Sequence, residues 1–258
     1  VSLLNLPDIW SPVWPANANT DNKVSPYEFK WIENLGAQMI EEIEITCGSQ
    51  TLQKYSGQYL HAMVQRDFSD TKKKLFNNMS GHVPELNNPA NDPTRVFTPP
   101  YQPNKYPNAV HTTNASGAEP SIRGRTIYVP INAWFTLDSR CAFPLVALQY
   151  QELNINITVR PLIDLFQVRD VFNHTENFPI IKVRPGEDAF QMYRVLQTPP
   201  AVDISASNYT NKMNSWDADV HLLSTYCFLS EDEKTSFAAK DQAYLVKEIH
   251  EYDFLNVV

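Results

Sequence analysis

The alternation of apolar and polar side chains is strongest between Gly124 and Arg160. In its first half, one face collects Ile127, Val129, Ile131, Ala133 and Phe135, while the other collects Tyr128, Pro130, Asn132 and Trp134. In its second half, Leu153, Ile155, Ile157 and Val159 alternate with Asn154, Asn156, Thr158 and Arg160. Successive strand side chains point to opposite sides of a sheet, so this spacing predicts two strands that each bury one face.

Shorter patterns predict further elements in the first quarter of the chain. Residues 2–6 are typical of the end of a strand, because Pro7 removes a ladder donor and holds Leu6 extended. Residues 43–47 alternate into Gly48, which predicts a half-exposed strand ended by a turn. From Leu52 to Phe68 the apolar spacing changes to three and four residues, which predicts an amphipathic helix in which Gly57 costs about 1 kcal/mol.

The last forty residues predict two extended segments around a helix. Residues 220–229 and 243–252 both carry strand-like patterns. Between them, Ser230 and Glu233 have the spacing of a capping box, in which the hydroxyl and the carboxylate each satisfy the other residue's amide. We therefore expect a helix to begin at Ser230.

The overall pattern indicates an all-β fold, an antiparallel sandwich with short helices in its connections. No repeated alternation of strands and helices is present to suggest a parallel sheet. Residues 82–124 hold eight prolines and lack periodicity. We expect this segment and residues 164–215 to be long exposed loop insertions.

Composition narrows the partners. The chain has 258 residues, of which 43% are hydrophobic and 19% charged, which suits a folded protein with a sizeable core. Its formal net charge of -8 argues against direct binding to nucleic acid, which depends on clustered basic residues. The run Lys72 to Lys74 is short and follows two aspartates, so we interpret it as a solvated turn. No apolar stretch approaches the ~18 residues that span a bilayer, and we expect no membrane insertion.

Candidate chemistry is sparse. The three cysteines, Cys47, Cys141 and Cys227, are widely spaced, and we expect them to be reduced, with Cys47 and Cys227 in the core. The six histidines include no H-x-H pair, and no nucleophile elbow, P-loop or zinc-protease motif occurs. The carboxylates at 41–42 and 231–233 are explained by a strand face and a helix cap. The sequence therefore predicts no catalytic residue, no metal and no cofactor.

Two residue types remain as candidate sites. Five N-x-[ST] motifs occur, at Asn78, Asn114, Asn156, Asn173 and Asn208, and the irregular segments make Asn114, Asn173 and Asn208 the candidate glycosylation sites. Trp10, Trp14 and Trp31 lie in a turn-rich region and are candidate interface anchors. The alternative for these tryptophans is that they cover the open end of the sandwich.

Four ordered stretches also carry a family resemblance: "WIENLGAQMIEEIEITCGSQTLQKYSGQYLHAM", "LFNNMSG", "IYVPINAWFTLDSRCAFPLVALQYQELNINITVRPL" and "YCFLSEDEKTSFAAKDQAYLVKEIHEYDF". Together they cover roughly half the chain. They resemble the double jelly-roll major capsid proteins of large icosahedral nucleocytoplasmic double-stranded DNA viruses. The resemblance implies that residues 1–258 are the first, N-terminal jelly roll, with its opening strand or strands missing.

The resemblance implies a structural role. Proteins of this family form trimeric, pseudo-hexagonal capsomers of a viral shell, so the expected partners are two identical chains, neighbouring capsomers and minor capsid proteins. The expected location is the virion, with assembly in the host cytoplasm.

Two other functions stay open. A non-capsid scaffold of the same fold, like the poxvirus assembly scaffold, would also form trimers but leave the mature particle. A carbohydrate-binding jelly roll would use loop aromatics such as Tyr101, Tyr106 and Tyr209.

Overall fold

The computed structural model describes most of the chain between Ser2 and Tyr252, with gaps. The described residues are 2–10, 13–14, 25–26, 28–89, 120–148, 150–170, 173, 175–176, 179–184, 186–187, 190–198, 209–241, 243–246 and 248–252.

The strands form small antiparallel sheets. One sheet has the order β11-β1-β7, a second β10-β9-β4 and a third β6-β5-β8, and β2 pairs with β3. The strands are β1 (Ser2–Leu6), β2 (Val13–Trp14), β3 (Ser25–Pro26), β4 (Phe29–Trp31), β5 (Ile40–Cys47), β6 (Gln50–Ser56), β7 (Arg125–Val129), β8 (Leu153–Val159), β9 (Phe166–Arg169), β10 (Ile180–Lys182) and β11 (His221–Leu222). The fold is all-β with antiparallel sheets and short helices, as the sequence predicts.

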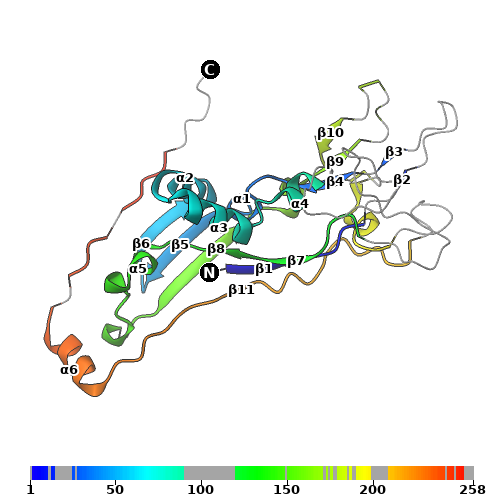
Figure 1. Ribbon diagram of the computed structural model, residues 1–258. Helices are drawn as coiled ribbons and strands as arrows, with labels where there is room; N and C mark the ends of the chain where they lie inside the picture. Colours follow the sequence, from blue (N-terminus) through cyan, green and yellow to red (C-terminus); the bar gives the residue numbers. More distant parts are fainter. Residues whose placement is uncertain are drawn as a thin grey trace.

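Short helices fill the connections. They are α1 (Leu35–Gln38), α2 (Gly57–Asp67), α3 (Asp70–Ser80), α4 (Pro84–Asn87), α5 (Trp134–Leu137) and α6 (Glu231–Ala239), with 3-10 turns η2 (Ser139–Cys141), η3 (Leu145–Ala147), η4 (Leu162–Asp164) and η6 (Met192–Arg194). Helices α1, α2 and α3 lie together beside β5, β6 and β7, whereas α6 stands apart at one end of the molecule (Figure 1). The helical layer therefore joins the β6-β5-β8 sheet to β7.

A single apolar core connects these sheets. Across the central ladder, Ile43 of β5 is paired with Ile157 of β8 and with Tyr55 of β6. The core continues through β1 and β7 to an aromatic group on β4 and β9. The opposite face of β5 carries glutamates and faces solvent, as expected for one side of an antiparallel sheet.

Several predicted elements are confirmed. Strands occupy 2–6 and 153–159, and residues 43–47 belong to the longer β5. Helix α6 begins after Ser230, whose hydroxyl accepts from the Glu233 amide at 3.4 Å, while the Glu233 carboxylate accepts from the Ser230 amide at 2.8 Å. The capping box therefore forms as its spacing predicts.

The predicted helix from 52 to 68 is wrong in its first part. Residues 50–56 form β6, because they complete the ladder with β5, and the helix begins only at Gly57. Gly57 lies where the backbone of α2 passes against the backbone carbonyls of Ala37 and Ile40, so that an added Cβ would collide with both oxygens. The glycine is thus required by close packing at the start of α2. The Lys72 to Lys74 run, predicted as a turn, lies on helix α3.

The first central strand is shorter than predicted. It ends at Val129, and residues 134–137 form α5 instead of continuing the alternation. Asn132 adopts a positive φ of 55°, which breaks the extended backbone between the two elements. The buried residues beyond it, Ile131 and Ala133, still belong to the apolar core.

The two predicted insertions include structured parts. Within 82–124, α4 forms and buries Leu86, and the backbone of Ile122 pairs with Ile9. Within 164–215, β9 pairs with both β4 and β10, and Phe166 is buried. These stretches therefore contribute to the core, although the sequence suggests exposed loops.

The last part of the chain differs most from expectation. Only His221 and Leu222 pair as a strand, and residues 223–230 and the described residues of 243–252 form no ladder. Cys227, expected in the core, is exposed, whereas Cys47 is buried. In Figure 1 this segment runs along one side of the molecule from β11 to α6 and then back past the sheet. We call residues 223–252 the C-terminal arm.

Candidate functional site

The predicted tryptophan anchors occupy different environments. Trp31 on β4 is only 1% exposed and packs edge-on against Phe29 and Trp216, with ring centroids 5.1 and 6.1 Å apart. Its position fits the alternative role, covering one end of the core. Trp10 is half-buried, and its amide donates to the Val195 carbonyl at 2.7 Å. Trp14 lies on β2, paired with β3.

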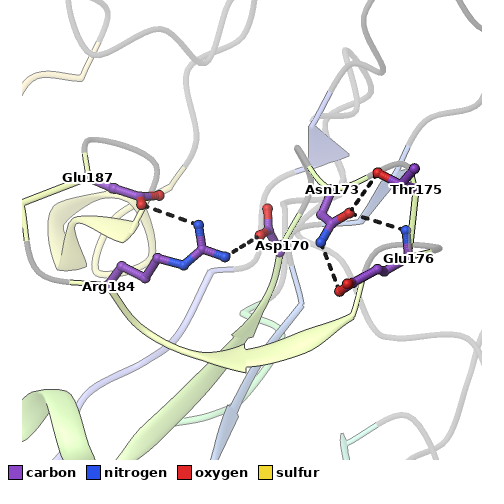
Figure 2. A network of polar contacts seen from close by, with 6 residues as sticks. All are labelled: Asp170, Asn173, Thr175, Glu176, Arg184 and Glu187. Atoms are coloured by element: carbon purple, nitrogen blue, oxygen red, sulfur yellow. Dashed lines mark hydrogen bonds and ion pairs between the residues drawn. The ribbon is translucent and has the colours of Figure 1, made fainter.

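Asn173 lies in the turn that joins β9 and β10. Its side-chain oxygen accepts from the hydroxyl of Thr175 at 3.3 Å and from the amide of Glu176 at 3.2 Å (Figure 2). Its amide nitrogen donates to the Glu176 carboxylate at 3.0 Å. An Asn oxygen that accepts from nearby following residues stabilises a local turn. Asn173, Thr175 and Glu176 are therefore held together locally, with Thr175 and Glu176 exposed.

A second polar group supports the base of this turn. Arg184, just after β10, donates to Asp170 at 3.2 Å and to Glu187 at 3.4 Å (Figure 2). Asp170 is only 4% exposed. Because a buried carboxylate without a partner is costly, the guanidinium makes this position tolerable and fixes the end of β9.

The remaining candidate glycosylation and carbohydrate-binding residues provide little support for a carbohydrate site. Asn114, Asn208, Tyr101 and Tyr106 lie outside the described residues. Tyr209 is 4% exposed, with its ring centroid 5.3 Å from that of Tyr193, and burial raises its pKa to about 12. A buried ring cannot stack on a sugar, so Tyr209 does not support glycan binding.

The surface that sequence reasoning missed is the C-terminal arm. It carries large apolar side chains that the rest of the chain leaves in solvent, including Phe228 at 96% exposed and Leu245 at 93%. The full set along the arm is Leu223, Tyr226, Phe228, Leu245, Val246 and Tyr252. The alternating pattern predicts a buried face at these positions, but a pattern alone does not say which molecule covers it.

A neighbouring group extends this surface. Leu137 on α5, Leu145 and Val146 on η3, and Tyr150 are also exposed, and η3 contacts α6. Large apolar patches at a protein surface typically mark sites of contact with other proteins. The end of the molecule that holds α5, η3 and α6 is therefore a candidate assembly surface.

The edge of β8 has the same character. Its sequence, LNINITV, holds no charge and no proline, the features with which proteins usually protect an open edge. Within the described part of the chain, β8 has a ladder partner only on the side of β5. An unprotected seven-residue edge is a template for pairing with another strand.

Charged side chains on the described surface form exposed pairs. Among the described residues, no group of three or more His, Cys, Asp or Glu side chains could hold a metal ion. The Glu42 carboxylate pairs with Lys54 at 2.9 Å on the solvent face of the sheet. Hydrogen bonds from Arg140 lower the pKa of Asp138 to about 2, in an exposed turn. In the described ranges, no helix is long and apolar enough to cross a bilayer.

Exposed apolar patches of this kind are typical of surfaces that contact other proteins. The comparisons with known proteins identify the family. The family model described as the major capsid protein N-terminus matches residues 13–229. The chain belongs to this family.

Individual relatives are distant. Two are named major capsid proteins: one of Chrysochromulina ericina virus, 24% identical over 85% of this chain and 32% of its own length, and one of Phaeocystis pouchetii virus, 22% identical over 85% and 35%. Among solved structures, the Faustovirus major capsid protein is similar, with a TM-score of 0.42 and 12% identity over 66% of this chain and 38% of that one. The chain thus spans about a third of the length of the curated relatives it matches.

Proposed function

We propose that this chain is part of a major capsid protein and builds the icosahedral shell of a double-stranded DNA virus. The observation that carries the proposal is the family match over residues 13–229. The role is structural, with no catalytic step and no cofactor, and places the protein in the virion after assembly in the host cytoplasm.

The exposed surfaces support this role. A shell needs moderate lateral contacts that symmetry repeats many times. The apolar side chains of the C-terminal arm are unfavourable while they stay in water, because burying apolar area lowers the free energy, and the edge of β8 leaves backbone groups open to pairing. They become useful where other protein surfaces cover them.

The proposed assembly unit is a homotrimer, which contacts neighbouring capsomers and minor capsid proteins. The test is the native mass of the full-length protein, measured by light scattering after size exclusion at micromolar concentration. A stable trimer is the expected result, and a monodisperse, folded monomer would contradict the proposal.

A second measurement separates a capsid protein from a transient scaffold of the same fold. Mass spectrometry of purified mature virions should find the protein among the most abundant components. A scaffold would be present in immature particles and lost from mature ones.

We further propose Asn173 as a glycan acceptor on the outer surface of this unit. Its motif lies in a turn in which Thr175 and Glu176 are exposed. Intact-mass and peptide analysis of virion protein should show a glycan at Asn173 that Thr175→Ala removes. Asn78 offers an internal control, since Ser80 of its motif is only 1% exposed and we expect it to stay unmodified.

A further inference from the structure

The start of helix α2 is capped by two residues that are far apart in the sequence. Ser56 adopts the extended backbone of an N-cap, and its hydroxyl accepts from the Tyr59 amide at 3.2 Å. In a capping box, an acid at the third helical position reaches back to the N-cap amide. That position is Tyr59 here, and the first turn of α2 holds no acidic residue.

Glu251 of the C-terminal arm supplies the missing carboxylate. Its Oε1 accepts from the Ser56 amide at 3.1 Å and from the Ser56 hydroxyl at 2.8 Å. A carboxylate at this place also faces the positive end of the helix dipole. Residues 195 positions apart thus complete a capping box that most helices complete locally.

Two apolar contacts hold the same part of the arm against the molecule. The Tyr244 ring lies 5.8 Å from that of Trp134, a buried residue of α5. Ile249 is half-buried and packs against the main apolar core. Between these attachments Leu245 is 93% exposed, so the segment is fastened at separate points and not embedded along its length.

We propose that Tyr244, Ile249 and Glu251 form a latch that couples the C-terminal arm to the helical layer through Glu251 and Ser56. When the latch is seated, α2 has a complete cap and its first turn is held against β6. When a neighbouring chain or a mechanical load draws the segment away, α2 loses the carboxylate and its first turn frays. The coupling free energy is reciprocal: the cap stabilises the attached state of the latch by the same amount as the attached latch stabilises the cap.

The test is amide hydrogen exchange on the full chain, comparing Glu251→Ala with the wild type. Loss of the carboxylate should speed exchange in the first turn of α2, including the Tyr59 amide, about fivefold, since an N-cap contact is typically worth that factor. Glu248→Ala is the matched control, because Glu248 lies on the same segment and pairs with His250 at 3.4 Å. It should leave exchange in α2 unchanged.

The reverse experiment tests the coupling. Ser56→Ala should increase the backbone mobility of residues 248–251, measured by NMR relaxation, although it alters nothing in the arm, and combining it with Glu251→Ala should add little. If Glu251→Ala leaves the α2 amides at the wild-type rate, the latch does not exist. Glu251→Gln, which keeps an acceptor but no charge, should fall between the two and remains informative if the alanine variant folds poorly.

Discussion

The central sheet and the C-terminal arm have similar apolar patterns but opposite environments. In β5, Ile40, Ile43 and Ile45 are fully buried, whereas on the arm Phe228 and Leu245 lie almost wholly in solvent. Both segments alternate, and both predict one buried face. Alternation therefore indicates that one face needs to be covered, and only the fold or the assembly determines which surface covers it.

The two regions also differ in the free energy gained from burying apolar side chains. Burying a large apolar side chain stabilises by about 1.5–3 kcal/mol relative to leaving it exposed. The sheet has gained this within the chain. The exposed apolar residues of the arm have not, so the free energy would fall wherever further protein surface covers them.

The largest expected effect comes from the buried aromatic group at β4. Trp31→Ala should lower the free energy of unfolding by about 3–5 kcal/mol, because it removes a fully buried ring and leaves a cavity between Phe29 and Trp216. Denaturant unfolding measures this loss. Phe228→Ala is the matched control on the arm and should stay within about 0.5 kcal/mol of the wild type.

This pair can also overturn the comparison. If Phe228→Ala destabilises the chain as much as Trp31→Ala, the arm is buried in solution and the assembly surface must be sought elsewhere. If both variants are near neutral, the aromatic group is not part of the cooperative core.

A smaller effect is expected where α2 passes against α1 and β5. Gly57→Ala should cost about 3 kcal/mol, since the new Cβ meets the carbonyl oxygens of Ala37 and Ile40, which are backbone atoms that cannot turn away. Gly186→Ala is the control, with a φ of 86° but open space around it, and should cost about 1 kcal/mol from backbone strain alone. Thermal unfolding of both variants measures the difference, and equal losses would show that close packing is not what requires Gly57.

Gly57 also shows how far the sequence predicts the structure. The strands at 2–6 and 153–159 and the capping box at Ser230 were predictable, because each depends on local spacing. The start of α2 was not, because Leu52 and Tyr55 fit both a helix and a strand, and pairing with β5 decides between them.

The candidate sites show the same division. Asn173 could be found from its tripeptide, and the structure adds the turn that presents it. Trp31 is of a residue type common at interfaces, but in the fold it is buried. Phe166 on β9, 135 positions away in the sequence, packs its ring against the Trp31 ring. The capping contact between Ser56 and Glu251 has no signature in the sequence, since it depends on the fold bringing the arm back to the start of α2.

A still smaller effect is expected in α6, which lies in the arm. Hydrogen bonds from the amide and then the hydroxyl of Ser230 lower the pKa of Glu233 below its ordinary value of 4.5. The ionised form is therefore favoured in the folded helix, so its contribution to α6 is complete above pH 4.5 and disappears as the pH falls through the lowered pKa. The Ser230 amide resonance in an NMR titration should follow this protonation, with a midpoint below 4.5.

Because α6 has no buried residue, its melting in acid should leave the central sheet intact. Amides of β5 and β8 should keep their slow exchange at a pH where those of residues 231–239 have lost theirs. Ser230→Ala should bring the Glu233 midpoint back toward 4.5 without changing the unfolding of the sheet. Loss of both regions at one pH would mean that the arm and the sheet fold as one unit, and the contrast between them would then be a difference of exposure only.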